Sequence, residues 1–536
     1  MTVAIGVLAS SWTGCAWAVA EEGGTMATDK QGGAGARGIS SSEMRFDVWR
    51  RRVGLYAGPA LLALLWVAPL PLETDAHRLA AIMGLVSLWW ITEAVPLPVT
   101  ALFGTALTVL TGVSAANAAF APFANPIIFL FVGSFIIGRA VAVHGLDLRI
   151  AQSLLTSKFV DGRVTRVPLV LGLLCVGVSG WVSGTATTAM MMPLALGVLS
   201  AMRAQGLEPG PTFGNRTMLT IAFAASIGSK VTPVGAASNM VALGFLESLG
   251  GVRIEFVTWM IMGIPLTIVM AIILMAMMRW LMPHSQADLA ARVSRGAAAS
   301  HDGREAPNLG PLTVAQRNCL LVFVGTAIFW LMPGVLRLLS DSPAVETLAQ
   351  RLNLGVVALT GASLLFILPA GAPDRRFTLT WKEAVQIDWG TILLFGGGLS
   401  LGQMMFATGL AEAIGRGLIV VSGAETLWGV TAMALAAAIA LTNLTSNTAT
   451  AAMLTPVVLS IAAASGLNPI PPALAVAFGC GVPYMLPIST PPNAIVYGSG
   501  MVPIVSMIKL GFVMSIAGFI CMFGLLRVML PLLGFA

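Results

Sequence analysis

Residues 442–448 read TNLTSNT, a run of hydroxyl and amide side chains in the middle of the long apolar stretch 428–464. A second run, SGWVSGT at residues 179–185, lies in the middle of another long apolar stretch, 168–202. Both stretches are too long for one membrane helix, which takes about 20 residues. Irregular backbone at membrane depth is tolerated only where it lines a cavity enclosed by protein. We therefore predict that each stretch is a re-entrant hairpin with its polar run at the tip.

The composition around these stretches is that of a membrane protein. Of the 536 residues, 57% are apolar and only 10% are charged, whereas soluble domains carry about 25% charged residues. A soluble chain of this length could not bury so much apolar surface. The composition therefore excludes a cytosolic enzyme, a secreted scaffold and a disordered protein, and it predicts an all-α polytopic membrane protein.

Hydropathy predicts about eleven spans in addition to the two hairpins. Of the 29 Lys and Arg residues, 19 fall in the five segments 1–52, 144–167, 203–216, 283–318 and 372–390. The positive-inside rule then places these segments and the N-terminus inside, and the C-terminus outside. We expect the protein in a bacterial inner (cytoplasmic) membrane. The predicted organisation is a cytoplasmic, mostly disordered tail at 1–52, a first span plus first repeat at 53–282, a cytoplasmic linker at 283–318 and a second repeat at 319–536.

The N-terminal region allows a second interpretation. Residues 1–20 are apolar and precede an acidic pair, as in a signal peptide, but the positively charged segment that begins such peptides is missing. We interpret the region as a cytoplasmic tail, and translation starts at Met26 or Met44 remain open.

The two halves of the chain resemble each other. Three matches occur in the same order, namely LFVG at 130–133 with LFGG at 394–397, SGTAT at 183–187 with SNTAT at 446–450, and, more weakly, Pro233 and Asn239 with Pro487 and Asn493. In the predicted topology the span of the first match runs inward and that of its partner runs outward, so the repeats are inverted. Inverted repeats with broken helices are typical of secondary transporters, whose site lies at the midplane between the halves.

Each hairpin is followed by a predicted helix break. The breaks read GSKVTP at 228–233 and PISTPPN at 487–493. Proline removes a backbone donor, and glycine permits close approach. Hydroxyls, amides and freed carbonyls suit a small alkali cation, whereas free N–H groups at the starts of half-helices suit an anion. Small polar residues also pack membrane helices closely, but two copies, each with a downstream break, favour a binding site.

These residues resemble the divalent-anion:sodium symporter (DASS) family, which moves dicarboxylates, citrate or sulfate. The pair of tips is similar to the family's twin Ser-Asn-Thr signature. The likeness extends to WITEAVPLP at 90–98, the segments 129–146 and 389–398, and TPPNAIV at 490–496. It covers nearly everything from residue 50 to the end. The resemblance implies a homodimer in which each protomer has a scaffold domain and a transport domain that moves like an elevator.

The resemblance also implies roles for individual residues. It assigns a first sodium site to Ser179, Ser183, Gly184 and Gly228, and a second to Thr442, Thr445, Asn447 and Ser489. The anion would lie between them, and the predicted substrate-binding residues are Thr185, Ser229, Lys230, Ser446, Asn447, Thr448, Thr490 and Pro491. Sodium is then the transported coupling ion, with no organic cofactor and no catalytic residue. The expected partners are a di-anionic small molecule, the lipid bilayer and a second copy of the chain, and nucleic acid is not among them.

The sequence departs from the family pattern at Gly184, where the family has asparagine. Close by stands Lys230, a basic residue deep in a predicted span. A charge at mid-bilayer is costly and indicates a function by default. We predict that its ammonium takes the place of the first sodium. The alternative is that Lys230 snorkels or pairs with a buried acid.

The sequence therefore predicts a secondary active transporter of C4 dicarboxylates such as succinate, malate and fumarate. It predicts sodium coupling with one sodium site altered. Two alternatives stay within transport: a sodium-independent dicarboxylate exchanger, and a carrier of sulfate or another divalent oxyanion. A third is an intramembrane hydrolase with Ser183 and Lys230 as a dyad, since a desolvated lysine can act as a base. Two polar tips argue against the hydrolase, which needs only one nucleophile.

Overall fold

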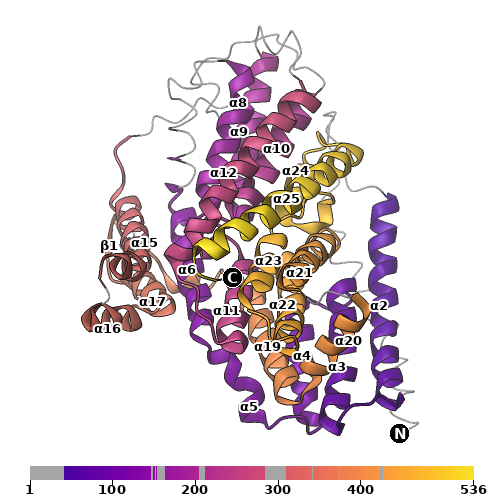
Figure 1. Ribbon diagram of the computed structural model, residues 1–536. Coiled ribbons are helices and arrows are strands. Elements are labelled where there is room, and N and C mark those ends of the chain that lie inside the picture. Colours follow the sequence, from indigo (N-terminus) through magenta and orange to yellow (C-terminus); the bar gives the residue numbers. More distant parts are fainter. Residues whose placement is uncertain are drawn as a thin grey trace. The chain divides into compact units, whose positions relative to one another are not determined.

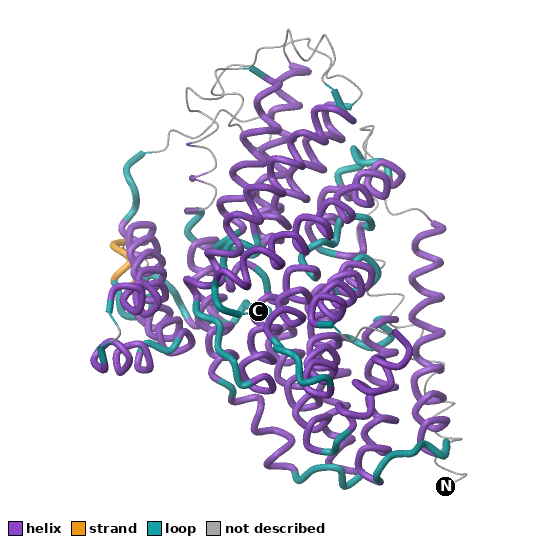
Figure 2. The backbone as a smooth tube through the Cα atoms, viewed as in Figure 1, coloured by secondary structure: helices purple, strands orange, loops and turns teal. Residues whose placement is uncertain are grey.

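The computed structural model describes residues 41–146, 149–150, 153, 163–204, 212–283, 310–340, 342–372, 375–422 and 426–535. The predicted disordered tail at residues 1–40 lies outside the described residues. The described chain is almost entirely helical (Figure 2), and its strands form one antiparallel pair, β1 (Pro369–Ala372) with β2 (Arg375–Phe377). The predicted all-α fold class is thereby confirmed.

The helices of the first half of the chain are α2 (Ser41–Val67), α3 (Thr74–Thr92), α4 (Leu97–Leu110), α5 (Ala116–Phe120), η1 (Ala121–Ala124), α6 (Pro126–Val143), η2 (Val164–Arg166), α8 (Val167–Ser179), α9 (Gly184–Ala204), α10 (Phe213–Gly228), η3 (Pro233–Gly235), α11 (Ala237–Gly250) and α12 (Phe256–Leu281). Those of the second half are α15 (Val314–Leu339), α16 (Pro343–Arg351), α17 (Leu354–Leu364), α18 (Trp381–Ala384), α19 (Trp389–Ala407), α20 (Leu410–Ser422), α21 (Leu427–Thr442), α22 (Asn447–Ala464), α23 (Ile470–Gly479), η4 (Pro487–Ser489), α24 (Pro491–Gly498) and α25 (Ile504–Leu532) (Figure 1).

Both long apolar stretches are pairs of helices joined by a short turn. Helices α8 and α9 meet at residues 180–183, which we call tip 1, and α21 and α22 meet at residues 443–446, which we call tip 2. The pairs begin and end within two residues of the predicted limits. That each pair enters and leaves the membrane on one side stays a prediction.

Each pair is followed by a helix that breaks and restarts. Break 1 covers residues 229–236 between α10 and α11, and break 2 covers residues 480–490 between α23 and α24. A 3₁₀ turn lies in each break and begins at a proline, Pro233 in η3 and Pro487 in η4. Proline has no N–H to donate to a preceding carbonyl, so each break lacks one helical hydrogen bond at this position.

The two breaks repeat one hydrogen-bond pattern. In each, the side-chain amide of an asparagine donates to the backbone carbonyls ten and seven residues earlier. The four bonds are Asn239 Nδ2 to Ser229 O (2.9 Å) and Thr232 O (3.2 Å), and Asn493 Nδ2 to Pro483 O (2.7 Å) and Leu486 O (3.0 Å). The shared pattern supports the internal repeat read from the sequence, and it pairs positions 254 apart.

The two repeats interlock around the breaks. Helix α9 of the first repeat packs on α24 of the second, and α11 packs on α22 and α23 (Figure 1). Within the first repeat, Gly228 permits α10 to touch α8, because a Cβ there would lie 2.2 Å from the carbonyl oxygen of Val176. Each tip therefore sits among helices of both halves.

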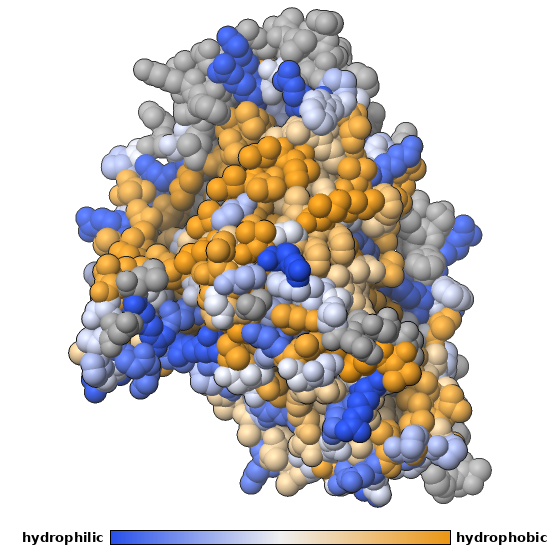
Figure 3. All heavy atoms as spheres, in the orientation of Figure 1, coloured by the Kyte–Doolittle hydropathy of each residue, from blue (hydrophilic) through white to orange (hydrophobic). Residues whose placement is uncertain are grey.

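Six helices of the described chain are long and apolar enough to cross a membrane: residues 126–143, 256–281, 314–337, 389–407, 447–464 and 504–532. Further apolar helices of the described chain are shorter, and they include both arms of the hairpin at tip 1, the first arm of the hairpin at tip 2 and α23. Large apolar side chains, among them Ile268 and Ile272 of α12 and Ile516 and Ile520 of α25, are exposed. Figure 3 shows an extensive hydrophobic surface on one face of the molecule, which suits a lipid environment.

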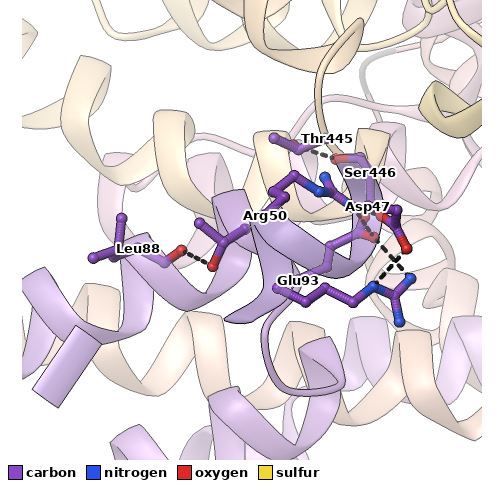
Figure 4. Close-up of polar contacts among 8 residues, drawn as sticks. Asp47, Arg50, Leu88, Glu93, Thr445 and Ser446 are labelled. Atoms are coloured by element: carbon purple, nitrogen blue, oxygen red, sulfur yellow. Dashed lines mark hydrogen bonds and ion pairs between the residues drawn. The ribbon is translucent and has the colours of Figure 1, made fainter. Parts of the chain in front are cut away.

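The first helix begins at Ser41, before the predicted limit of the tail at residue 52. The reason is that the basic residues there are paired. Arg50 contacts Asp47 at 2.8 Å and Glu93 at 3.0 Å, and Arg51 contacts Asp47 at 2.9 Å (Figure 4). Glu93 follows α3 with a left-handed backbone, φ 49°. These ion pairs lie within the N-terminal half of α2 and tie it to Glu93 at the end of α3.

Candidate functional site

Tip 2 is bonded to break 2 by side chains at the end of α21. The Thr442 hydroxyl lies 2.7 Å from Asn447 Oδ1 and 2.9 Å from the carbonyl oxygen of Cys480. The Asn443 amide donates to Val482 O at 3.1 Å, and its oxygen accepts from the Met485 N–H at 2.9 Å. Tip and break therefore form one polar unit in which hydroxyl, amide and carbonyl oxygens lie close together.

The structure places the predicted second sodium ligands in this unit but joins only two of them directly. Thr442 and Asn447 are in contact, as described. Thr445 Oγ1 lies 3.0 Å from Thr450 Oγ1 and 3.4 Å from Ser446 O (Figure 4). The Ser489 hydroxyl bonds within its own break, to Leu486 O at 2.5 Å. The oxygen-only chemistry of the set fits a hard cation.

Five of the eight predicted anion-binding residues, Ser446, Asn447, Thr448, Thr490 and Pro491, lie at helix N-termini that lack a side-chain cap. Helix α22 starts after Ser446 and α24 starts after Thr490, and neither residue caps the N–H groups that follow. Helix α11 starts after Ala236, which cannot cap. Uncapped N–H groups and the helix dipole together favour an anion. Ser446, Asn447 and Thr448 are half-buried, Thr490 is buried, and Thr185 and Pro491 are exposed.

The four predicted residues of the first sodium site gather around the end of α10. A Cβ on Gly228 would lie 2.3 Å from Ser179 Oγ, and one on Gly184 would lie 3.4 Å from Ala225 O. Ser183 caps α9 by accepting from the Ala186 N–H at 3.3 Å. The Ser179 hydroxyl is buried and has no hydrogen-bond partner.

The unpartnered Ser179 has a physical explanation in the repeat. Its counterpart, 263 positions later, is Thr442, which contacts Asn447. The counterpart of Asn447 is Gly184, which has no amide to offer. The two halves differ again at the breaks, because Ala236 stands 254 positions before Thr490. Sequence reasoning found the loss at Gly184 but missed the one at Ala236, which the alignment of the breaks reveals.

Lys230 is completely buried between the two breaks. Its Nζ donates to Ser226 O at 2.9 Å and to Gly481 O at 2.5 Å, and it lies 5.9 Å from the centre of the Tyr484 ring. Among the described residues no Asp or Glu oxygen lies within 4.0 Å of it. In this structure Lys230 neither snorkels nor pairs with an acid; its ammonium is held by carbonyl oxygens, as a sodium ion would be.

The ammonium nevertheless bonds across to break 2 and not to tip 1. Its partner Gly481 belongs to break 2 and follows Cys480, whose carbonyl oxygen lies beside the Thr442 hydroxyl. A Cβ on Gly481 would lie 2.9 Å from Nζ, so a side chain there would displace the end of the lysine. Lys230 thus joins the two repeats beside the second predicted sodium site. Sequence reasoning did not identify Gly481 or Tyr484, although Tyr484 stands at the repeat position of Lys230.

The same geometry bears on the predicted role of Ser229 in substrate binding and on the alternative of a Ser183–Lys230 dyad. The Ser229 hydroxyl donates back to Ser226 O at 2.8 Å, so in this structure it is turned toward α10. The bonds of Lys230 go to carbonyls and not to Ser183, whose oxygen caps α9. A Ser183–Lys230 dyad is therefore not formed.

Comparison with known proteins gives a match over nearly the whole chain. The family model described as the sodium:sulfate symporter transmembrane region matches residues 50–535. The chain is 30% identical over 482 residues to the sodium-dependent dicarboxylate transporter SdcS of Staphylococcus saprophyticus, covering 86% of this chain and 88% of that protein. The protein of the same name in Staphylococcus aureus is 28% identical over 481 residues, covering 86% and 87% of the two chains.

A solved structure shares the fold. The crystal structure of the YdaH transporter of Alcanivorax borkumensis superposes with a TM-score of 0.51, covering 91% of this chain and 98% of that one, at 17% sequence identity. An identity this low supports a common fold and carries no further argument.

Proposed function

This chain belongs to the sodium:sulfate symporter family, and from that membership and the geometry of the two tips we propose that it carries C4 dicarboxylates such as succinate, malate and fumarate across a membrane. The family and the named relatives are transporters, so the protein is a transporter and not an enzyme.

The substrate proposal is carried by one observation: tip 2 and break 2 present half-buried polar side chains and uncapped helix starts in one place. Helices α22 and α24 begin there without a side-chain cap. Asn447, Thr448 and Thr490 add neutral hydrogen-bonding groups that suit a carboxylate. Relatives of nearly the same length are named sodium-dependent dicarboxylate transporters, which supports a dicarboxylate ahead of sulfate.

For the coupling ion we propose one sodium at the second site. Its oxygens would come from Thr442, Thr445, Asn447 and Ser489, of which Thr442 and Asn447 are already in contact. At the first site Gly184 lacks the amide and the Ser179 hydroxyl lacks a partner. We propose that this site does not bind sodium and that the fixed ammonium of Lys230 supplies the positive charge.

The fixed charge has a consequence for coupling. A sodium ion leaves with the substrate, whereas the ammonium remains in the empty carrier. A charged empty site is costly to move through a bilayer. The proposal therefore predicts slow return of the empty carrier and favours exchange of one dicarboxylate for another.

For the moving part we propose a body made of α8–α11 and α21–α24. The supporting observations are the bonds that tie these elements together, from Asn443 to Met485 and from Lys230 to Gly481. The body would move like an elevator against a scaffold formed by the remaining helices, in a homodimer. We place the N-terminus inside and the C-terminus outside a bacterial inner membrane.

Uptake into proteoliposomes tests the substrate. The purified full-length protein is reconstituted, and uptake of labelled succinate is measured with unlabelled malate, fumarate and sulfate as competitors. We expect uptake that malate and fumarate inhibit and sulfate does not. Uptake of labelled sulfate without uptake of succinate would replace this proposal with the oxyanion carrier.

A further inference from the structure

A cavity of about 450 Å³ lies between the first turns of α8 and α10 and the last turns of α12. Tip 1 is at the opposite end of α8, and break 1 is at the opposite end of α10, so the cavity is separate from the substrate and ion site. Its volume is that of a small-molecule site. The family resemblance assigns it no role.

The cavity is positively charged. Arg216 of α10 and Arg279 of α12 line it, together with the hydroxyl-bearing Thr220, and none of its described lining residues is acidic. Arg216 Nη1 donates to Met282 O at 2.9 Å, which anchors the guanidinium at this end of α12. The N-terminal ends of α8 and α10 add the positive ends of their dipoles. The cavity therefore suits a phosphate.

Apart from Thr165, the rest of the cavity wall is apolar, and it continues onto an exposed apolar surface. Leu169 of α8 and Met275 and Met278 of α12 line it. Farther along the same helices, Leu173 and Ile272 are 48% and 63% exposed. The site therefore suits a ligand with an apolar part that lies along α8 and α12.

The neighbouring tryptophan indicates the level of the lipid headgroups. Trp280 follows Arg279 in the last turn of α12 and is 78% exposed. Tryptophan is enriched where a membrane meets water. Basic pockets between membrane helices at this level bind the headgroups of anionic lipids. Trp280 places the cavity at the headgroup level of one leaflet, whichever side of the membrane that leaflet faces.

We propose that the cavity binds one anionic phospholipid, with its phosphate at Arg216 and Arg279 and an acyl chain along Leu173 and Ile272. A soluble phosphate would meet the same arginines but would leave the apolar walls unused. Because α8 leads directly into tip 1, the bound lipid would also steady the helix that carries this tip.

The test is a lipid titration of the purified full-length protein, followed by native mass spectrometry. The probes are phosphatidylglycerol and, as the neutral comparison, phosphatidylcholine. The variant is Arg279→Gln, and the matched control is Arg416→Gln, an exposed arginine on α20. We expect phosphatidylglycerol to bind more tightly than phosphatidylcholine, and Arg279→Gln to weaken it about fivefold, the equivalent of about 1 kcal/mol for one basic group near anionic lipid. The control should leave the affinity unchanged.

Three results would overturn the proposal. They are equal binding of the two lipids, equal affinity for phosphatidylglycerol in both variants, and displacement of the lipid by soluble glycerol 3-phosphate at similar concentration. A second measurement needs no variant: phosphatidylglycerol with a photoreactive acyl chain is crosslinked to the natural protein. Labelled peptides should come from α8 and α12, and labelling confined to other helices would also overturn the proposal.

Discussion

Replacing Lys230 with methionine separates the contribution of its ammonium to stability from its contribution to transport. The change removes the charge and keeps most of the side-chain volume. Two charge-assisted hydrogen bonds, to Ser226 O and Gly481 O, are lost, at about 1.5–3 kcal/mol each. Against this, burial of an ammonium costs several kcal/mol. The two contributions nearly cancel, so we expect the free energy of unfolding to change by less than about 2 kcal/mol.

We expect Lys230→Met to change succinate transport much more strongly than it changes the free energy of unfolding. Contacts lead from Nζ through Gly481, Cys480 and Thr442 to Asn447. They place the ammonium within about 12 Å of tip 2, and at an effective dielectric of about 20 one unit charge at that range is worth about 1.4 kcal/mol. This energy corresponds to a tenfold change in affinity for each carboxylate. We therefore expect Lys230→Met to raise the KM for succinate at least about tenfold.

The assay is initial-rate uptake of labelled succinate into proteoliposomes, with thermal unfolding measured on the same preparations. Lys509→Met, an exposed lysine on α25, is the matched control and should transport normally. Adding Gly184→Asn to Lys230→Met should restore succinate affinity at high sodium and make the sodium dependence steeper. A Cβ at Gly184 meets only ordinary contacts, so a side chain can begin there without displacing the backbone of α10. An unchanged KM in Lys230→Met would refute the role of the charge, and a collapse in stability would refute the energy balance.

Three further changes test the neighbouring contacts. Asn447→Ala should abolish uptake while the protein stays folded by size-exclusion chromatography and thermal unfolding; near-normal uptake would remove tip 2 from the mechanism. Ser179→Ala removes a hydroxyl without a partner and should leave uptake and its sodium dependence unchanged, whereas Thr442→Val removes the hydroxyl that lies between Asn447 Oδ1 and the Cys480 carbonyl oxygen and should cost about 1–3 kcal/mol of stability together with most uptake. A weakened sodium response in Ser179→Ala would show that the first site still binds sodium. Gly481→Ala places a methyl group against the ammonium of Lys230 and should raise the KM for succinate as Lys230→Met does; a normal KM would contradict the placement of that ammonium.

Much of the fold was predictable because the sequence marks it with strong physical signals. The low charge content requires a membrane protein, and polar runs inside long apolar stretches require interrupted helices. The turns at residues 180–183 and 443–446 lie within these polar runs. The start of α2 was not predictable, because the pairing of Arg50 with Glu93 joins residues far apart in the sequence.

The sequence could predict which residues belong to the site, but not which of them contact one another. Tip residues such as Asn447 could be named from the repeat. The direction of the Lys230 side chain could not be predicted from the sequence. It depends on which carbonyl oxygen the packing of the two breaks brings within hydrogen-bond distance of Nζ. That carbonyl belongs to Gly481, more than two hundred residues away in the sequence. The sequence shows that Gly184 lacks an amide, but only the three-dimensional contacts show that the Ser179 hydroxyl is left without a partner.

The sodium dependence of succinate uptake by the natural protein tests the central claim most directly. Proteoliposomes are loaded with unlabelled succinate or left empty, and the initial rate is measured as external sodium replaces choline. The account predicts succinate uptake with a first-order dependence on sodium, faster in the preloaded vesicles. Second- or higher-order dependence, with equal rates in empty and preloaded vesicles, would contradict it and would mean that sodium ions, not Lys230, supply the charge at both sites.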